Sequence, residues 1–228
     1  MDRQYTVQGL EMLHNAMLRA VQGTAFTGPA VDGNNTYATA SELASHAVNL
    51  PGAIVSGNIL FLFAETNNGA TLTVTGWTEI TCGGGFHSLF YKVATGLEGA
   101  TQTVVCTPTA QLVAVTLKVS AANAAPIHAS GWYTLATGSG STIPLPSVTS
   151  TIPNTLFVGF GGHIGGGGGS MTENQSAVEI VDYAPASLAW NIAACKKNLS
   201  VASSLAVTFT LSAAKTYRAG IAVIVAPA

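Results

Sequence analysis

Strict alternation of apolar and polar residues is the feature that most constrains what this chain can fold into. In "SLAVTFTL" the residues expected to face inward are Leu205, Val207, Phe209 and Leu211. In "LVAVTLKVS" the inward set is Val113, Val115, Leu117 and Val119, and the outward set is Ala114, Thr116 and Lys118. A two-residue period is typical of a half-buried β-strand. The chain is therefore expected to be built mainly from β-sheet.

Similar short stretches recur along the chain, separated by clusters of Gly, Asn, Ser and Pro. They are "SHAVNL", "NILFLFAE", "ATLTVTGW", "HSLFYKVA", "TQTVVCT", "TLFVGFG", "AVEIVDY", "SLAWNIAA" and "YRAGIAVIV". No helical segments of ten to fifteen residues separate them, which argues against a parallel α/β sheet. The fold class expected is all-β: an antiparallel two-sheet β-sandwich, jelly-roll-like, spanning residues 45–228.

The N-terminal 44 residues differ from the rest. A helix is predicted over residues 7–22, because Leu10, Leu13, Met17 and Val21 recur at helical spacing on one face. Residues 23–44 have turn chemistry and predict an extended arm. A helix of this length is marginal alone in water, so its apolar face needs a cover. Residues 1–44 are therefore expected to anchor a homo-oligomer through that face.

Composition excludes several partners. Charged residues make up 8% of the chain, and 8 Lys and Arg stand against 10 Asp and Glu. A backbone of nucleic acid is captured by clustered basic residues, so nucleic acid is not an expected partner. The apolar runs fall short of the roughly 20 residues of a spanning helix, so no membrane insertion is expected. The start lacks the pattern of a signal peptide, which favours synthesis in the cytoplasm.

No residue pattern indicates catalysis, a cofactor or a metal. The three cysteines, Cys82, Cys106 and Cys195, form no C-x-x-C and are expected to be buried, reduced thiols. The five histidines lie far apart in the sequence and have no second ligand at metal-binding spacing. The glycine-rich run "GFGGHIGGGGGS" lacks the Lys and Ser or Thr of a phosphate-binding loop. It is interpreted as a flexible surface connection between strands, with a ligand-contacting loop as the alternative.

Several local patterns carry predictions of their own. Trp77 is expected in the core or at a sheet edge, and Trp190 in the core, in phase with Leu188 and Ile192. Glu98 in "ATGLEGA" is expected to accept hydrogen bonds from the N–H groups of its turn. Lys92 is expected to be solvated.

The segment "SHAVNLPGAIVSGNILFLFAE…GWTEI…SLFYKVATGLEGATQTVV…LVAVTLKVSAANAAP" resembles a β-sandwich module of tailed-bacteriophage proteins. It departs from that pattern at Asn58, where an acidic residue is usual, and at Ala121, where glycine is usual. The start "YTVQGLEMLHNAML" is similar to the helical start of some phage tail-associated proteins. The resemblance implies a non-enzymatic virion component, tail- or fibre-associated, assembled as a homo-oligomer, most simply a trimer, with other virion proteins. It implies no catalytic or ligand residues.

Two other functions remain open. The same sandwich could serve as a capsid decoration or cement protein. It could also be a carbohydrate-binding module that recognises a glycan on the host surface, with Trp132 and Tyr133 as stacking residues in "ASGWYTLATGSGS", a segment interpreted as a loop. An enzyme is not expected, because the chain has no G-x-S-x-G and no evident pair of carboxylates.

Overall fold

The computed structural model describes residues 26–80, 85–135, 140–164 and 170–228. These residues form β-strands and no helix, so the all-β prediction is confirmed. The strands, in chain order, are β1 (Ala30–Asn49), β2 (Ile59–Thr66), β3 (Thr71–Thr73), β4 (Thr78–Ile80), β5 (His87–Val93), β6 (Thr101–Ser120), β7 (Ala122–Leu135), β8 (Gly140–Pro144), β9 (Val148–Ser150), β10 (Thr155–Ile164), β11 (Met171–Glu173), β12 (Val178–Tyr183), β13 (Trp190–Leu199), β14 (Ser203–Leu205) and β15 (Thr208–Pro227).

The chain contains the same sheet twice. The N-terminal half pairs its strands in the order β1-β6-β2-β5-β4, and β3 joins β6. The C-terminal half pairs its strands in the equivalent order β15-β10-β13-β12. The place of β1 beside β6 is taken by β7 and β8 together, beside β15. The place of β3 on β6 is taken by β11 on β15. All of these pairs are antiparallel. Residues 30–120 and 122–227 are therefore structural repeats.

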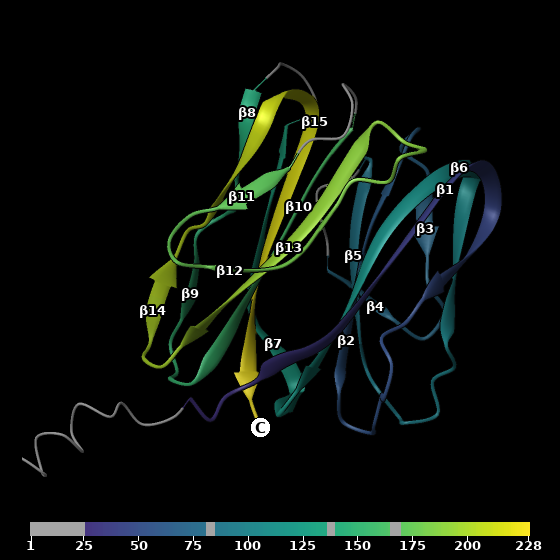
Figure 1. Cartoon of the computed structure of the whole chain (residues 1–228). Coiled ribbons are helices and arrows are strands. Elements are labelled where there is room, and N and C mark those ends of the chain that lie inside the picture. Colours follow the sequence, from purple (N-terminus) through teal and green to yellow (C-terminus); the bar gives the residue numbers. More distant parts are fainter. Residues whose placement is uncertain (1–25, 81–84, 136–139, 165–169) are drawn as a thin grey trace, which may run out of the picture.

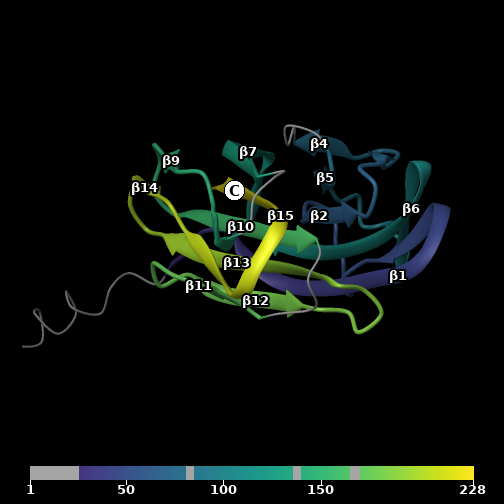
Figure 2. The same ribbon diagram turned by 90° about the horizontal axis from the view of Figure 1, so that it is seen from above.

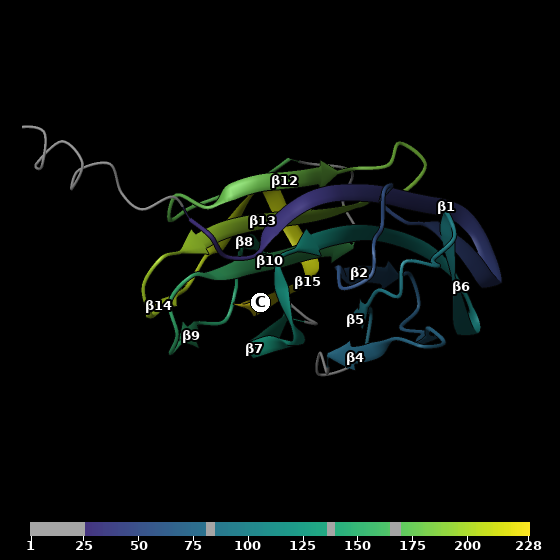
Figure 3. The same ribbon diagram turned by 90° about the horizontal axis from the view of Figure 1, so that it is seen from below.

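The two halves pack face to face as a sandwich around one shared core. Figure 1 shows the C-terminal half, coloured from teal to yellow, beside the N-terminal half, coloured from purple to teal. The ring centroids of Phe61 and Phe63 lie 5.9 and 5.4 Å from that of Phe160, so β2 faces β10. On either side of this contact the strands of the two halves run in opposite order. A rotation of 180° about an axis parallel to the strands would therefore place each half on the other. Seen along the strands, β4 and β7 meet at one edge and β1 and β12 at the other (Figures 2 and 3).

Each half also has an outer core of its own, on the face of its sheet turned away from the partner half. The long strand β6 pairs with β2 over its second part and with β3 over its first part, so it passes from the shared layer to the outer one. This explains one wrong prediction. Ala114, Thr116 and Lys118 were expected to face solvent, but they are buried: Ala114 belongs to the outer core, and the end of β1 with the segment after it contacts Thr116 and Lys118. Thr116 Oγ1 donates to Asn49 O at 2.8 Å, and Lys118 Nζ donates to Gly52 O and Ala53 O, each at 3.0 Å.

The inward faces were predicted correctly. Both alternating sets named above are buried, one in the shared core and one in the outer core of the C-terminal half. Leu188, Trp190 and Ile192 lie together in the shared core as expected. Trp77 packs against the outer core of the N-terminal half, and its Nε1 donates to Gln102 Oε1 at 3.0 Å.

Three segments differ from expectation. Residues 30–44, predicted as an arm, belong to β1, because pairing with the buried β6 satisfies their backbone despite their turn-type side chains. The segment around Trp132 and Tyr133, predicted as a loop, belongs to β7, which pairs with β15 for the same reason. Two strands predicted at 101–107 and 112–120 are one continuous strand, β6.

The glycine-rich run is also partly a strand. β10 continues to Ile164, so Gly161 and Gly162 lie inside the sheet and do not form a surface connection. A Cβ at Gly161 would lie 2.6 Å from Cδ2 of Phe209, and one at Gly162 would lie 1.5 Å from Oε1 of Glu65. These glycines allow two close approaches of side chains to the strand. Residues 165–169 lie outside the described residues.

Candidate functional site

An open groove runs along one edge of the sandwich, between β4 and β5 of the first half and β7 of the second. It encloses a cavity of about 440 Å³, lined by Gly76, Thr78, Tyr91, Lys92, Val93, Ala124, Ala125, Pro126 and Ile127. This volume falls in the range of small-molecule sites. The groove exists because β4 and β7 are the outermost strands of the two facing sheets at this edge.

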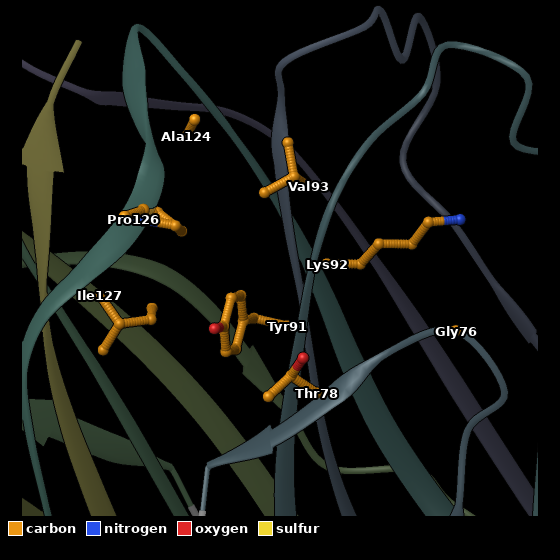
Figure 4. A pocket seen from close by; sticks show the side chains of 9 residues that line it. Gly76, Thr78, Tyr91, Lys92, Val93, Ala124, Pro126 and Ile127 are labelled. Atoms are coloured by element: carbon orange, nitrogen blue, oxygen red, sulfur yellow. The ribbon is translucent and has the colours of Figure 1, made fainter.

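Tyr91 is the centre of the groove. It is half-buried and packs against the shared core, as does Ile127 opposite. Figure 4 shows the Tyr91 ring directed toward Ile127, with the Thr78 hydroxyl beside it and the Lys92 side chain extending away from both. Lys92 Nζ lies 3.0 Å from Glu98 Oε1, so its charge is paired outside the groove. The surface offered to a ligand therefore combines an aromatic ring with hydroxyl groups and carries no free charge of its own.

Trp132 extends the same surface along β7. It pairs with Ile221, whereas Ile127 pairs with Val225, and both of these partners face the shared core. Residues directly opposite on paired strands lie on the same face, so Trp132 and Ile127 share one face of β7. Trp132 is 48% exposed and is the one aromatic residue among the exposed large apolar residues of the described part of the chain. Tyr133 points to the opposite face and packs partly against the outer core.

The repeat places a second groove at the other edge, between β1 and the pair β12 and β13. It encloses about 310 Å³ and is lined by Val31, Asp32, Gly33, Asn34, Glu179, Ile180 and Lys196. By strand register Lys196 occupies the place of Tyr91, Val31 that of Ile127, and Thr36 that of Trp132. Lys196 Nζ donates to Val31 O at 3.3 Å. Equivalent positions therefore form an aromatic groove on one edge, whose Lys92 is paired with Glu98, and a groove lined by Asp32, Glu179 and Lys196 on the other.

No family model, curated protein or solved structure matches the chain.

A buried ion pair lies between the two halves. His87 Nε2 is 2.9 Å from Glu65 Oε1, and both side chains are almost fully buried. Burial raises the pKa of the Glu65 carboxyl, and the neighbouring His87 only partly opposes this. The His87 ring stacks on Phe63, with centroids 6.3 Å apart. Since the pair lies inside the core against Gly162, no substrate can reach it in this structure, and its position favours a role in joining the halves.

A second set of buried polar side chains lies in the C-terminal half. His163, Asn191 and Lys215 are buried there, and both ring nitrogens of His163 lack a hydrogen-bond partner among the described residues. Burial, with the charge of Lys215 nearby, lowers the pKa of His163 to about 4. Within the described part of the chain, no group of His, Cys, Asp or Glu is arranged to hold a metal, and no helix could cross a membrane.

The other predicted residues fall in three places. Leu10, Leu13, Met17 and Val21, and also Cys82, lie outside the described residues. Cys106 and Cys195 are buried free thiols, and burial raises their pKa to about 11 and about 12. Glu98 accepts hydrogen bonds from the N–H groups of Thr95 and Gly96 at 2.8 and 2.9 Å, as predicted.

Sequence reasoning named Trp132 and Tyr133 as candidates but did not name Tyr91 and Thr78, which line the groove. Nothing local marks these two, because the groove forms only where strands from different halves meet. No local signal could have found it, because β4 comes to lie near β7 only through the packing of the two sheets (Figures 2 and 3).

Proposed function

We propose that this chain is a non-enzymatic structural protein of a bacteriophage virion, tail- or fibre-associated, and displayed on the particle as a homo-oligomer, a trimer. It is made in the host cytoplasm and joins other virion proteins. The proposal rests on the resemblance of residues 45–126 to phage sandwich modules. The proposal includes a jelly-roll-like arrangement of the strands. It also includes a helix over residues 7–22 that anchors the chain by self-association.

The polarity of the sandwich supports this proposal. Ala30 pairs with Ser120, and Ala228 N donates to Ala121 O at 3.1 Å. The first strand therefore begins at the same end of the molecule as the C-terminus, visible at the bottom of Figure 1. The turn after β2 lies at the far end, beyond Glu65 and His87. A body joined to a particle through its N-terminal segment would present that far end outward.

Removing residues 1–24 tests the anchoring role. We expect the truncated chain to keep the β-sheet circular dichroism of the full chain but to become a monomer in size-exclusion chromatography with light scattering. Incorporation into virions should be lost. A truncated chain that keeps its oligomeric state and still incorporates would contradict the proposal.

Point variants sharpen the same test. Leu13→Asp combined with Met17→Asp places charge on the predicted apolar face and should dissociate the oligomer. Asn15→Asp, off that face, is the matched control and should leave assembly unchanged.

Two alternatives are separated by other measurements. Labelled electron microscopy of virions distinguishes a tail or fibre position from capsid decoration. A receptor-recognition module that binds a host glycan is favoured by one observation, the exposed Trp132 at the edge of the β4–β7 groove. An exposed Trp132 is also compatible with display on a particle, so one chain could both serve as a virion structural protein and recognise a host glycan.

A further inference from the structure

We propose that the groove between β4–β5 and β7 binds a neutral oligosaccharide, with Tyr91 and Trp132 as stacking platforms and Thr78 as a hydrogen-bonding residue. The proposal rests on the receptor-recognition alternative and adds the site and the class of ligand. Tyr133 is left out because it faces the outer core.

The first argument is the pairing of aromatic faces with hydroxyl groups. Pyranose rings have an apolar face of C–H groups that packs on an aromatic ring and a rim of hydroxyls that needs hydrogen-bonding partners. Aromatic rings supply large contact area with a negatively polarised face. Tyr91 and Thr78 place a ring and hydroxyls side by side (Figure 4), and Trp132 supplies a second, solvent-exposed ring.

The second argument is length. Along β15, the partners of Ile127 and Trp132 are four residues apart, which corresponds to about 13 Å of strand. Trp132 therefore extends the surface well beyond Ile127, and a ligand that contacts both suits a chain of several sugar rings. The groove is open at Gly76, where an added Cβ would meet nothing within 4 Å.

The third argument is charge. Lys92, the one charged residue at the groove, pairs with Glu98 and extends away from the Tyr91 ring. An acidic sugar would find no unpaired cation among the residues that line this cavity. The equivalent groove at the other edge carries Asp32, Glu179 and Lys196 and lacks an aromatic ring, so a neutral glycan has no stacking surface there.

The test uses the full chain on an array of bacterial surface oligosaccharides, neutral and acidic, followed by calorimetric titration of the strongest neutral compound. We expect Trp132→Ala to weaken binding about tenfold or more, because a large aromatic ring in contact with a ligand carries a large share of the affinity. Thr78→Ala should weaken binding by a smaller factor. Asn34→Ala, on the equivalent groove, is the matched control and should bind as the wild type does.

A spectroscopic measurement separates contact from loss of folding. The chain has three tryptophans. The ligand should shift the indole N–H signal of Trp132, identified as the one missing in Trp132→Ala, and leave that of the buried Trp190 unchanged.

Four outcomes overturn the proposal, and they differ in what they leave standing. Two of these outcomes refute glycan binding in this groove but leave receptor recognition standing. One is binding of acidic compounds only. The other is binding of a neutral compound that is lost in Asn34→Ala and kept in Trp132→Ala. Silence of the whole array removes both and leaves the virion structural proposal, which the truncation tests separately. A change of oligomeric state in Trp132→Ala, without glycan binding by the wild type, would make the groove a contact between copies of this chain.

Discussion

The two halves share a strand order but differ at the positions that face each other across the axis. Strand register makes Glu65 and His87 of the first half equivalent to Gly162 and Ile192 of the second. Two copies of the first half would bring two carboxylates together in a buried site, where like charges are costly. Two copies of the second half would leave a space where the Glu65 side chain lies. The halves therefore fit each other better than either would fit a copy of itself.

The turns after the equivalent strands β5 and β13 differ in a similar way. The turn in the first half is held by Glu98, which accepts two backbone N–H groups and the Thr95 hydroxyl and pairs with Lys92. The equivalent position in the second half is Ser203, whose hydroxyl makes one long hydrogen bond of 3.4 Å to Val201 O. The first half thus uses charge at places where the second uses small residues.

The largest expected effect comes from breaking the buried pair. His87→Ala leaves the Glu65 carboxyl alone in the core and should lower the free energy of unfolding by about 3–5 kcal/mol, measured by urea denaturation. Replacing both, as Glu65→Met with His87→Leu, should stay within about 1 kcal/mol of the wild type, because apolar residues of similar volume can replace a buried ion pair. A loss below about 1 kcal/mol in His87→Ala would contradict the stabilising role of the pair.

Adding a side chain at Gly162, which lies against Glu65, should have the next largest effect on stability. Gly162→Ala forces the Glu65 side chain to move within a packed core and should cost about 1–3 kcal/mol of unfolding free energy. Gly52→Ala is the control, since its Cβ would meet nothing within 4 Å. In a Glu65→Gly background the cost of Gly162→Ala should largely disappear, and a cost that persists there would place the strain elsewhere.

The turn carboxylate should have a smaller, pH-dependent effect. Partial burial alone would raise the pKa of Glu98, but hydrogen bonds from Thr95 and Lys92 lower it from 4.5 to about 2. Because the folded pKa is the lower one, its stabilisation is present above pH 4.5 and is lost as the pH falls from about 4.5 toward 2.

Glu98→Ala should therefore cost about 1.5–2 kcal/mol at pH 7, the lower end of the range for hydrogen bonds to a charged group. Its unfolding curve should approach that of the wild type near pH 2. Ser203→Ala, at the equivalent position, should change little. A difference between Glu98→Ala and wild type that is constant over this pH range would refute the assignment.

The smallest expected difference concerns the two outer cores. Cys106 and Cys195 lie in the outer cores of the first and second half, and burial raises both thiol pKa values. In a Cys82→Ser background, a disulfide reagent at pH 8 should label neither quickly and Cys106 before Cys195, since Cys195 is the more deeply buried. Mass spectrometry of the labelled protein gives the order. Rapid labelling of Cys195 would show that the C-terminal outer core opens first.

The sequence was sufficient for the fold class and insufficient for the arrangement. Alternation identified the inward faces of β6 and β15, because a two-residue period is a local property. Glu65 could not be predicted as an internal residue, since its ion pair and the room at Gly162 come from different halves. Residues 30–44 and the strand around Trp132 were misassigned because pairing with a long buried strand outweighed their weak local β character.

The repeat has a consequence for biosynthesis. The strands that pair at the ends of each half are far apart in sequence: Ala30 pairs with Ser120, and Ala122 pairs with Pro227. Such long-range pairing folds slowly, so neither sheet closes until its last strand leaves the ribosome. The first half is then complete while its inner face, with Phe61 and Phe63, still lacks the strands that will cover it. Until β10, β13 and β15 have been translated, this face is the part of the nascent chain most exposed to aggregation and most in need of a chaperone.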